Sequence, residues 1–173
     1  MSSRSFDLAV VGGGVIGLAH AYVAAKAGKR VAVIDKDPRA NGASIRNFGF
    51  ITVTGQERGD SWRLARRTRD VWAEVAAGAG LSIEQHGLYL TARSVEAVAV
   101  IEAFLKTEMG EGCRLLAPEE FRRLADGLGG PDLEAVLRSP HELRMESRDA
   151  IPALAAWLEK IWSVTFYNET MVF

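Results

Sequence analysis

The stretch FDLAVVGGGVIGLAHAYVAAKAGKRVAVIDKD, residues 6–37, decides the fold of this chain. Residues 7–11 form a short continuous apolar run, which predicts a strand buried on both faces of a parallel sheet. A helical pattern begins at Val15, and Gly28 supplies a stop signal for that helix. A second apolar run, residues 31–34, predicts the next strand. The order of strand, helix and strand indicates an α/β fold of the Rossmann type.

Three glycines with G-x-G-x-x-G spacing join the first strand to the helix. Gly12 permits a tight turn, Gly14 lets the backbone approach a pyrophosphate, and Gly17 allows close packing of helix against strand. The N-terminus of the helix offers unpaired N–H groups and a positive dipole end to phosphates. Asp35 ends the second strand 18 residues after Gly17, where a carboxylate can bind ribose hydroxyls. These features predict a dinucleotide site; the alternative is a glycine-rich turn in another α/β unit.

The stretch DKDPRANGASIRNFGFI, residues 35–51, is too irregular for a helix or strand and carries more large side chains than a surface turn requires. It resembles the flavoproteins of the D-amino-acid oxidase and glycine oxidase superfamily. Their first unit reads G-x-G-x-x-G-x-x-x-A, which Ala21 completes here, and a G-A-S/T turn and a segment along the isoalloxazine ring follow. The resemblance runs the whole length of the chain and implies FAD as the cofactor. It disfavours an NAD-dependent dehydrogenase, whose second strand usually leads into another helix.

The resemblance implies a role for each motif. The first helical turn would present backbone amides to the pyrophosphate, the end of the second strand would flank the adenosine ribose, and the G-A-S turn would touch the pyrophosphate and ribityl region. The helical turn would supply Val15 and Ile16, the strand end would supply Asp35 and Lys36, and the G-A-S turn would supply Ala43 and Ser44. The residues lining the flavin ring would be Arg46, Asn47, Phe48, Gly49 and Phe50. The alternative makes the two phenylalanines core residues and the arginine a solvated loop charge.

Helices and strands follow one another in the rest of the chain. The patterns predict helices that begin at Asp60, Ser94, Pro118 and near Ser147 or Asp149, strands over 87–92 and 164–173, and loop signals over 127–140. In the family, the last helix and strand end in T-x-V, whose valine backbone meets the adenine; Thr170 and Val172 match. The family usually ends that helix with glycine, whereas this chain has Trp162 and Ser163.

Two further sets of residues have a functional and a plain interpretation. The arginines of the helix that begins at Asp60 could form an anion site, but a solvated helix face partly offset by Asp70 and Glu74 is favoured; they are Arg63, Arg66, Arg67 and Arg69. His86 and His141 could face a substrate, but surface or satisfied core positions are favoured.

Composition excludes several classes of function. The 173 residues are 48% hydrophobic and 25% charged, with a net charge of -1, which is typical of a globular protein and argues against a nucleic-acid partner. No apolar run is long enough to span a bilayer, and MSSRSF leads directly into the first predicted strand. The single cysteine, Cys113, excludes an internal disulfide and a cysteine-based zinc site, so no metal is predicted. A cytoplasmic location is expected.

The fold expected is a Rossmann-like FAD-binding βαβ unit with part of an α+β substrate domain. Residues 1–80 would begin the FAD-binding domain, residues 81–150 would form a partial substrate domain, and residues 151–173 would return to the first domain. Because chains of the family are much longer, this chain is expected to be an N-terminal portion that is inactive alone, and no catalytic side chain is predicted.

The expected activity is hydride transfer to flavin from the carbon beside the nitrogen of a small amine or amino acid. The motif A-S-x-R-N-F-G also resembles a subgroup found beside phosphonate-metabolism genes, which implies an aminophosphonate as one candidate substrate. The alternatives are a 2-hydroxy-acid dehydrogenase and a non-catalytic nucleotide-binding fragment. Non-covalent FAD is predicted, because Cys113 lies far along the chain from the ring motifs and His20 lies in the first helix.

Overall fold

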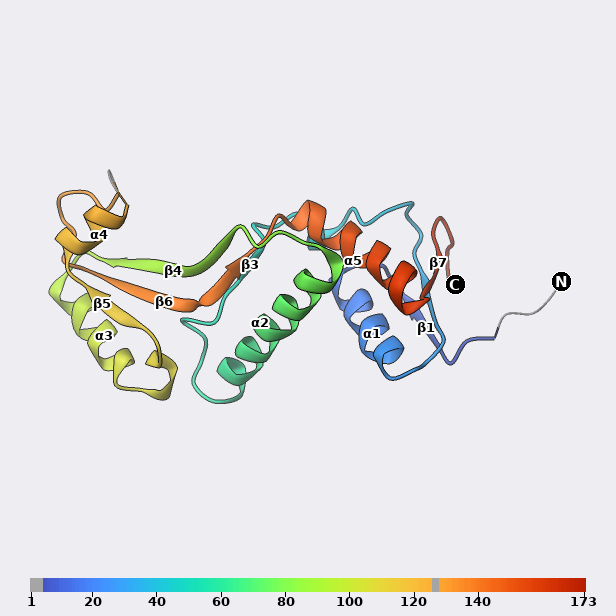
Figure 1. Ribbon diagram of the computed structural model, residues 1–173, viewed down its shortest axis with the longest axis horizontal. Coiled ribbons are helices and arrows are strands. Elements are labelled where there is room, and N and C mark those ends of the chain that lie inside the picture. The colour runs from blue at the N-terminus through green and yellow to red at the C-terminus, as the bar shows by residue number, and fades with distance from the viewer. Residues whose placement is uncertain (1–4, 126–127) are drawn as a thin grey trace. The chain divides into compact units, whose positions relative to one another are not determined.

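A computed structural model describes residues 5–125 and 128–173 of the chain (Figure 1). Gly127, the first residue of the predicted loop stretch, lies outside the described residues, as do the first four residues. The chain divides into two compact units. The first contains Met1–Gly49, Trp72–Ile83 and Met145–Phe173, and the second contains Phe50–Val71 and Glu84–Arg144.

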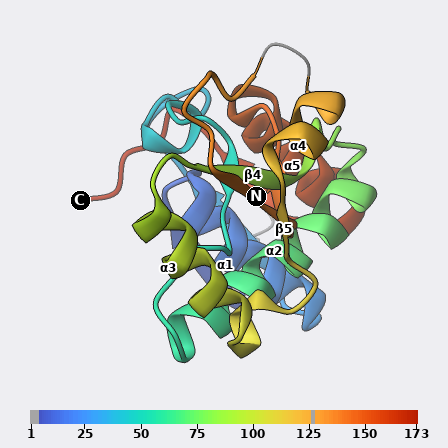
Figure 2. The same ribbon diagram turned by 90° about the vertical axis from the view of Figure 1, so that its left-hand side faces the viewer.

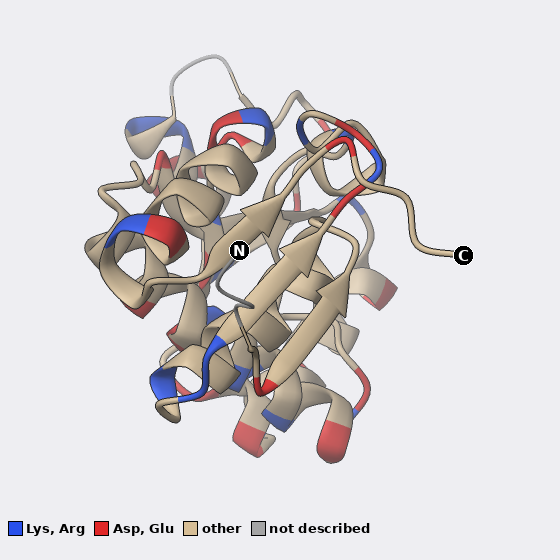
Figure 3. Ribbon diagram, turned by 90° about the vertical axis from the view of Figure 1, so that its right-hand side faces the viewer, with Lys and Arg blue, Asp and Glu red and all other residues tan. Residues whose placement is uncertain are grey.

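The first unit contains a parallel sheet with the strand order β1-β2-β7. Figure 3 shows the three arrows side by side and pointing the same way, without charged residues in the strands themselves. The helices of this unit are α1, α5 and the last part of α2. The bounds are β1 Leu8–Val11, α1 Val15–Lys26, β2 Val31–Ile34, α2 Asp60–Ala79, α5 Ser147–Trp162 and β7 Thr165–Tyr167. The α/β fold predicted from the glycine-rich stretch is confirmed.

Helix α1 packs through small and aromatic side chains. Leu18 and Ala21 are fully buried, and the Tyr22 ring lies 5.3 Å from the Trp157 ring and 5.6 Å from the Trp162 ring of α5. The predicted stop at Gly28 is confirmed: this glycine has a φ of 75°, and the N–H of the next residue donates back to the helix. A left-handed glycine just after a helix satisfies its last carbonyl groups.

The prediction that the strand at residues 7–11 is buried on both faces is wrong. In β1, Leu8 is 36% exposed and Val11 is 67% exposed, whereas Val31 and Val33 of β2 are buried. The reason is position: within the described part of the chain β1 pairs only with β2, so that β2 is the central strand. An apolar run predicts a strand well, but it does not reveal which neighbours that strand has.

The prediction of a strand over residues 164–173 is correct only in part, because β7 covers just Thr165–Tyr167. After β7 the chain turns at Glu169, which has a φ of 53°. The Thr170 N–H then donates to the Asp35 carbonyl oxygen at 2.9 Å. The last residues therefore cross the carboxyl end of β2 instead of extending the sheet.

Ser163 ends α5 in the conformation that glycine adopts most easily. Its φ and ψ are 55° and 30°, and the Val164 N–H donates to the Leu158 carbonyl oxygen at 3.1 Å. The helix therefore ends in a Schellman-type turn even though glycine is replaced by serine at this position.

We expect Ser163→Gly to stabilise the first unit. The left-handed conformation costs an L-residue about 1–2 kcal/mol, and the greater freedom of glycine in the unfolded chain offsets about 0.4–1 kcal/mol of the gain. The free energy of unfolding should rise by roughly 0.5–1 kcal/mol, measured by urea denaturation. Ser163→Ala, which keeps the strained conformation, is the control and should give no gain. A Ser163→Gly variant less stable than wild type would contradict this reading of the turn.

The second unit contains an antiparallel sheet with the order β3-β6-β4, and β5 also pairs with β6. Figure 2 faces this unit and shows α3 and α4 with the sheet. The bounds are β3 Phe50–Ile51, β4 Gln85–Ala92, α3 Val95–Leu105, β5 Arg114–Leu116, α4 Pro118–Leu124 and β6 Ala135–Arg144. The strand predicted over 87–92 and the helices predicted from Ser94 and Pro118 are therefore present.

The loop prediction over 127–140 is wrong for its second half, because β6 begins at Ala135. Val136 and Leu137 are buried in the core and pair with both β4 and β5. Pro140 is tolerated in this strand because the register with β4 shifts between His86 and Leu88, opposite the proline. A proline inside a strand usually marks such an irregularity, and here it concealed the strand.

None of the helices in the described part of the chain combines the length and the apolar character needed to cross a bilayer.

Candidate functional site

The glycine turn is fixed by the packing of the chain itself. Gly12 has a φ of 103°, and its N–H donates to the Ile34 carbonyl oxygen at 2.8 Å. A Cβ atom built on Gly17 would overlap the Gly12 carbonyl oxygen and would lie 3.2 Å from a methyl group of Val10. Glycine is therefore required at the first and third positions of the motif, whatever ligand the turn holds.

The N-terminus of α1 is suited to an anion. Its N-cap is Gly14, in an extended conformation, and its first turn, residues 15–18, contains only apolar residues and glycine. The Val15 N–H donates to the Ser44 hydroxyl at 3.0 Å, which brings the G-A-S turn to the start of the helix. These residues border a cavity of about 670 Å³. Its other lining residues include Gly12, Ile16, Gly17, His20, Ala43 and Asn47. The positive end of the helix dipole favours a negative group there.

Asp35 holds the glycine turn against the end of β2. One carboxylate oxygen accepts the Gly13 N–H at 2.5 Å, and the other accepts the Asp37 N–H at 2.9 Å. Because a carboxylate oxygen can accept more than one hydrogen bond, both oxygens keep capacity for a ligand hydroxyl. The two backbone donors therefore orient the acid at the mouth of the turn.

A second cavity, of about 350 Å³, collects residues from three distant parts of the sequence. The C-terminal segment reaches it because the Asp35 N–H donates to the Tyr167 carbonyl oxygen and the Asp35 carbonyl oxygen accepts the Thr170 N–H. The predicted site residues that line this cavity are Gly12, Gly14, Asp35, Lys36, Ser44 and Val172. The structure thus brings the glycine turn, the acid, the serine and the terminal valine together.

The loop that follows the second strand is locked from within by Asn47. The side-chain NH₂ of Asn47 donates to the carbonyl oxygens of Ala43 and Ser44 at 3.0 Å each, and its carbonyl oxygen accepts the Gly49 N–H at 2.8 Å. These three bonds close around the short 3₁₀ turn η1, Ala43–Ile45. The structure directs this side chain, predicted to line the flavin ring, into its own loop.

Gly49 is required by a neighbouring backbone. It has a φ of 69°, and a Cβ atom on it would overlap the Met145 carbonyl oxygen. The Met145 N–H donates to the Gly49 carbonyl oxygen at 3.1 Å. The sequence predicted close approach to a flavin ring, whereas the structure shows close approach to the chain that precedes α5.

The remaining residues of the predicted ring-facing set are at the surface. Phe48 is 80% exposed and Phe50 is 62% exposed, so the alternative that made them core residues is wrong. Phe50 belongs to β3 in the second unit. Arg46 is exposed and forms no ion pair with any residue that the structure describes.

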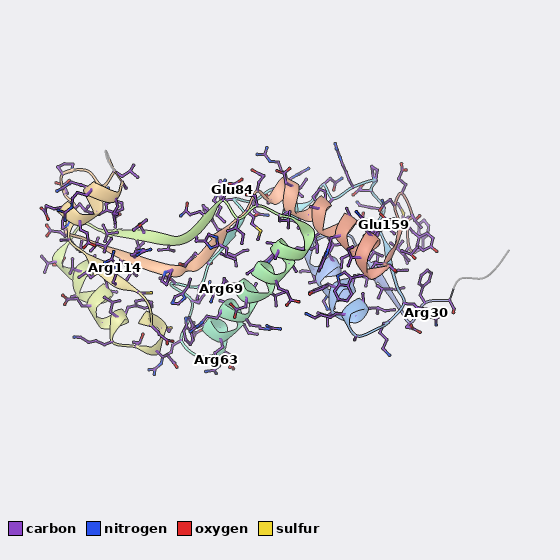
Figure 4. All side chains as sticks on the ribbon, viewed as in Figure 1. Arg30, Arg63, Arg69, Glu84, Arg114 and Glu159 are labelled. Carbon is purple, nitrogen blue, oxygen red and sulfur yellow. The ribbon has the colours of Figure 1, made fainter. Side chains whose placement is uncertain are left out.

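The arginines of α2 and the two histidines follow the plain interpretation. Arg63 pairs with Asp60, Arg66 with Glu111, and Arg69 with Asp70, as predicted for the last pair (Figure 4 labels Arg63 and Arg69). Glu74 accepts the Tyr22 hydroxyl and pairs with Lys26 of α1. His141 is buried and its ring bonds to the Glu111 carbonyl oxygen at 2.6 Å, whereas His86 is exposed in β4.

The second unit holds a buried carboxylate that the sequence analysis missed. Glu142 is 4% exposed, and its carboxylate accepts the N–H groups of Val53 and Thr54 at 3.3 and 2.7 Å. Burial raises the pKa of this carboxyl, but the hydrogen bonds that it accepts, led by that from the Thr54 backbone, outweigh burial and leave the pKa below its ordinary value. Only the placement of a glutamate in a strand of buried residues could have indicated this contact.

Residues 7–172 match the family described as FAD dependent oxidoreductase. The chain belongs to this family. The predicted membership and the predicted cofactor, FAD, are thereby confirmed at the level of the family.

Individual relatives agree with this membership. D-amino acid dehydrogenase of Helicobacter pylori (strain ATCC 700392 / 26695) is 46% identical over 47 residues, which are 27% of this chain and 12% of that protein. Glycine oxidase from Bacillus cereus ATCC 14579 superposes with a TM-score of 0.80 at 25% identity, over 98% of this chain and 49% of that one. L-proline dehydrogenase from P. horikoshii shares the fold, with a TM-score of 0.80 at 23% identity over 95% of this chain and 44% of that one. The chain therefore spans about half or less of the length of these proteins.

Proposed function

We propose that this FAD dependent oxidoreductase chain supplies the cofactor-binding part of an enzyme that oxidises the C–N bond of a small amine or amino acid. The observation that carries the proposal is the cavity of about 350 Å³ in which the glycine turn, Asp35, Ser44 and Val172 meet. The relatives whose names specify amino-acid substrates support the substrate class.

The residues present fit FAD chemically. The first turn of α1 offers backbone N–H groups and a positive dipole end to the pyrophosphate, with Ser44 beside them. Asp35 can accept the ribose hydroxyls, and Lys36 lies on the same cavity. Val172, whose backbone is proposed to meet the adenine, lines the same cavity, which supports the assignment. A competing carboxylate at the start of α1 would weaken this fit, and apolar residues stand there instead.

The residues assigned to the ring region are Arg46, Phe48 and Gly49. Asn47 is assigned an indirect role, because its side chain holds the loop that carries them. When bound, FAD accepts the hydride from the carbon beside the amine. The exposed Arg46 would place a positive charge where negative charge develops during that transfer. A neutral substrate amine loses hydride more easily, so a site that favours the free base helps the reaction. A contact between Phe50 and the flavin ring stays a prediction.

We further propose that the first unit is the FAD-binding part and that the second unit is part of the substrate domain. The antiparallel sheet of the second unit, with helices α3 and α4, suits an α+β substrate domain. The cytoplasmic location and the aminophosphonate substrate stay predictions.

The test is the visible spectrum of purified full-length protein before and after addition of substrates. We expect a flavin spectrum, release of the yellow colour into the supernatant on acid denaturation, and anaerobic bleaching by small amines or amino acids. Bleaching by aminophosphonates would narrow the substrate class. Bleaching by 2-hydroxy acids alone would refute C–N oxidation, and flavin that stays with the precipitated polypeptide would refute non-covalent binding.

A further inference from the structure

The hydroxyl group of Ser147 contacts a loop that is distant in the sequence instead of capping its own helix. It is the first residue of α5 and is 6% exposed. A serine at a helix start usually caps the helix, but here the N-cap is Glu146, whose carboxylate accepts the Arg148 N–H at 3.1 Å. The Ser147 hydroxyl lies instead 2.9 Å from the Asn47 carbonyl oxygen and 3.3 Å from the Ile45 carbonyl oxygen. It can donate to either of them.

These contacts add to the hydrogen bonds that the carbonyl oxygens of loop 43–49 accept. The carbonyl oxygens of Ala43 and Ser44 accept the Asn47 side chain, those of Ile45 and Asn47 face the Ser147 hydroxyl, and that of Gly49 accepts the Met145 N–H. Five carbonyl oxygens of the loop therefore face donors from the protein itself. The side chains of Arg46 and Phe48 stay at the surface.

We propose that Ser147 is a positioning residue for FAD: it holds the loop 43–49 so that the side chains of Arg46 and Phe48, and not the carbonyl oxygens of Ile45 and Asn47, are presented to the flavin ring. The inference rests on the proposed function, because it takes that loop as the ring-facing one. Negative charge grows on the ring as it is reduced, so a carbonyl oxygen turned toward it would oppose reduction, and a guanidinium would favour it. The Asn47 side chain also holds the loop in this conformation, because it donates to the carbonyl oxygens of Ala43 and Ser44.

Loss of the Ser147 hydroxyl removes the one donor that the Ile45 and Asn47 carbonyl oxygens share. A buried acceptor without a partner costs about 1–3 kcal/mol, so the loop is expected to rearrange until these oxygens reach water. That rearrangement changes the surface offered to the cofactor. We therefore expect the dissociation constant of FAD to rise about tenfold in Ser147→Ala, and the flavin absorption band to change shape.

The experiment compares full-length wild type with Ser147→Ala, Ser147→Thr and Ser94→Ala. Ser94 is a matched control, because its hydroxyl accepts the Ala97 N–H at 3.2 Å at the start of α3 in the second unit. Each alanine variant removes one serine hydroxyl at a helix start and should lower the melting temperature of apoprotein to a similar extent. Only Ser147→Ala should weaken FAD binding and alter the flavin spectrum, and Ser147→Thr should restore both at least in part.

Asn47→Asp keeps the inference testable if Ser147→Ala does not fold. This exposed residue keeps its acceptor for the Gly49 N–H but loses the two donors to Ala43 and Ser44, so FAD binding should weaken in the same direction. If Ser147→Ala binds FAD as tightly and with the same spectrum as Ser94→Ala, the positioning role is overturned. If wild type takes up no FAD, the proposed function itself fails, and the inference fails with it.

Discussion

Gly14→Val is expected to remove FAD from the full-length protein almost completely, whereas Asp35→Ala should remove only part of it. A Cβ atom on Gly14 would already lie 3.1 Å from the Ser44 hydroxyl oxygen. Valine adds two methyl groups at the N-terminus of α1, where the pyrophosphate is proposed to bind, and displaces the hydroxyl that accepts the Val15 N–H. The valine side chain is therefore expected to block the proposed pyrophosphate site sterically.

Asp35→Ala leaves that position open and removes hydrogen bonds to the ribose instead. Such bonds to a charged acceptor contribute about 1.5–3 kcal/mol, which corresponds to a rise of roughly 10- to 150-fold in the dissociation constant of FAD. The variant also loses the carboxylate that accepts the Gly13 N–H. Flavin content per polypeptide, measured by absorbance after purification, should fall in the order wild type, Asp35→Ala, Gly14→Val.

Ala19→Val is the control for valine in the same helix. Ala19 lies on the exposed side of α1, so the substitution changes helix propensity by a few tenths of a kcal/mol without entering the glycine turn. Its flavin content should match wild type. Equal flavin content in Gly14→Val and wild type would refute the assignment of the turn to the cofactor.

Gly49→Ala should destabilise the protein more than any other glycine-to-alanine change in residues 35–51, the stretch that follows β2. The positive φ costs an L-residue about 1–2 kcal/mol, and relief of the overlap with the Met145 carbonyl oxygen requires a backbone shift that costs about 1–3 kcal/mol more. We expect the free energy of unfolding to fall by roughly 2–5 kcal/mol, measured by urea denaturation.

Gly55→Ala separates the two causes. Gly55 has a φ of 86°, but a Cβ atom on it would meet open space, so only the conformational cost of about 1–2 kcal/mol applies. A difference between the two variants therefore measures the overlap at Met145. If both variants lose the same stability, the close approach between Gly49 and Met145 does not exist in solution.

The strand–helix–strand unit could be predicted because its signals are local. Gly12, Gly17 and Asp35 lie within one supersecondary unit, and each is required by geometry that the unit alone imposes. The membership of the FAD dependent oxidoreductase family could be inferred for the same reason. The hydrogen bond from the Gly49 N–H to the Asn47 side chain could also have been predicted, because an asparagine two residues before a glycine commonly bonds to the nearby backbone.

The features that the sequence did not indicate depend on distant partners. The Ser147 hydroxyl meets carbonyl groups 100 and 102 residues earlier in the chain, and Glu142 meets amides 88 and 89 residues earlier. The exposure of Val11 depends on which strands flank β1, and β6 was concealed by Pro140 at a register shift. Local propensity carries no information about such contacts.

The position of β7 and the residues after it has a consequence for the order in which the site forms. Tyr167 and Thr170 close over Asp35 through the backbone, although more than 130 residues separate them from it. At a synthesis rate of roughly 5–20 residues per second, the ribosome needs on the order of ten seconds to cover that interval. The glycine turn can form as a local unit during this time, but the wall that carries Val172 is still missing. FAD is consequently expected to bind only after residues 167–172 have been synthesised and the chain has closed this loop at its entropic cost.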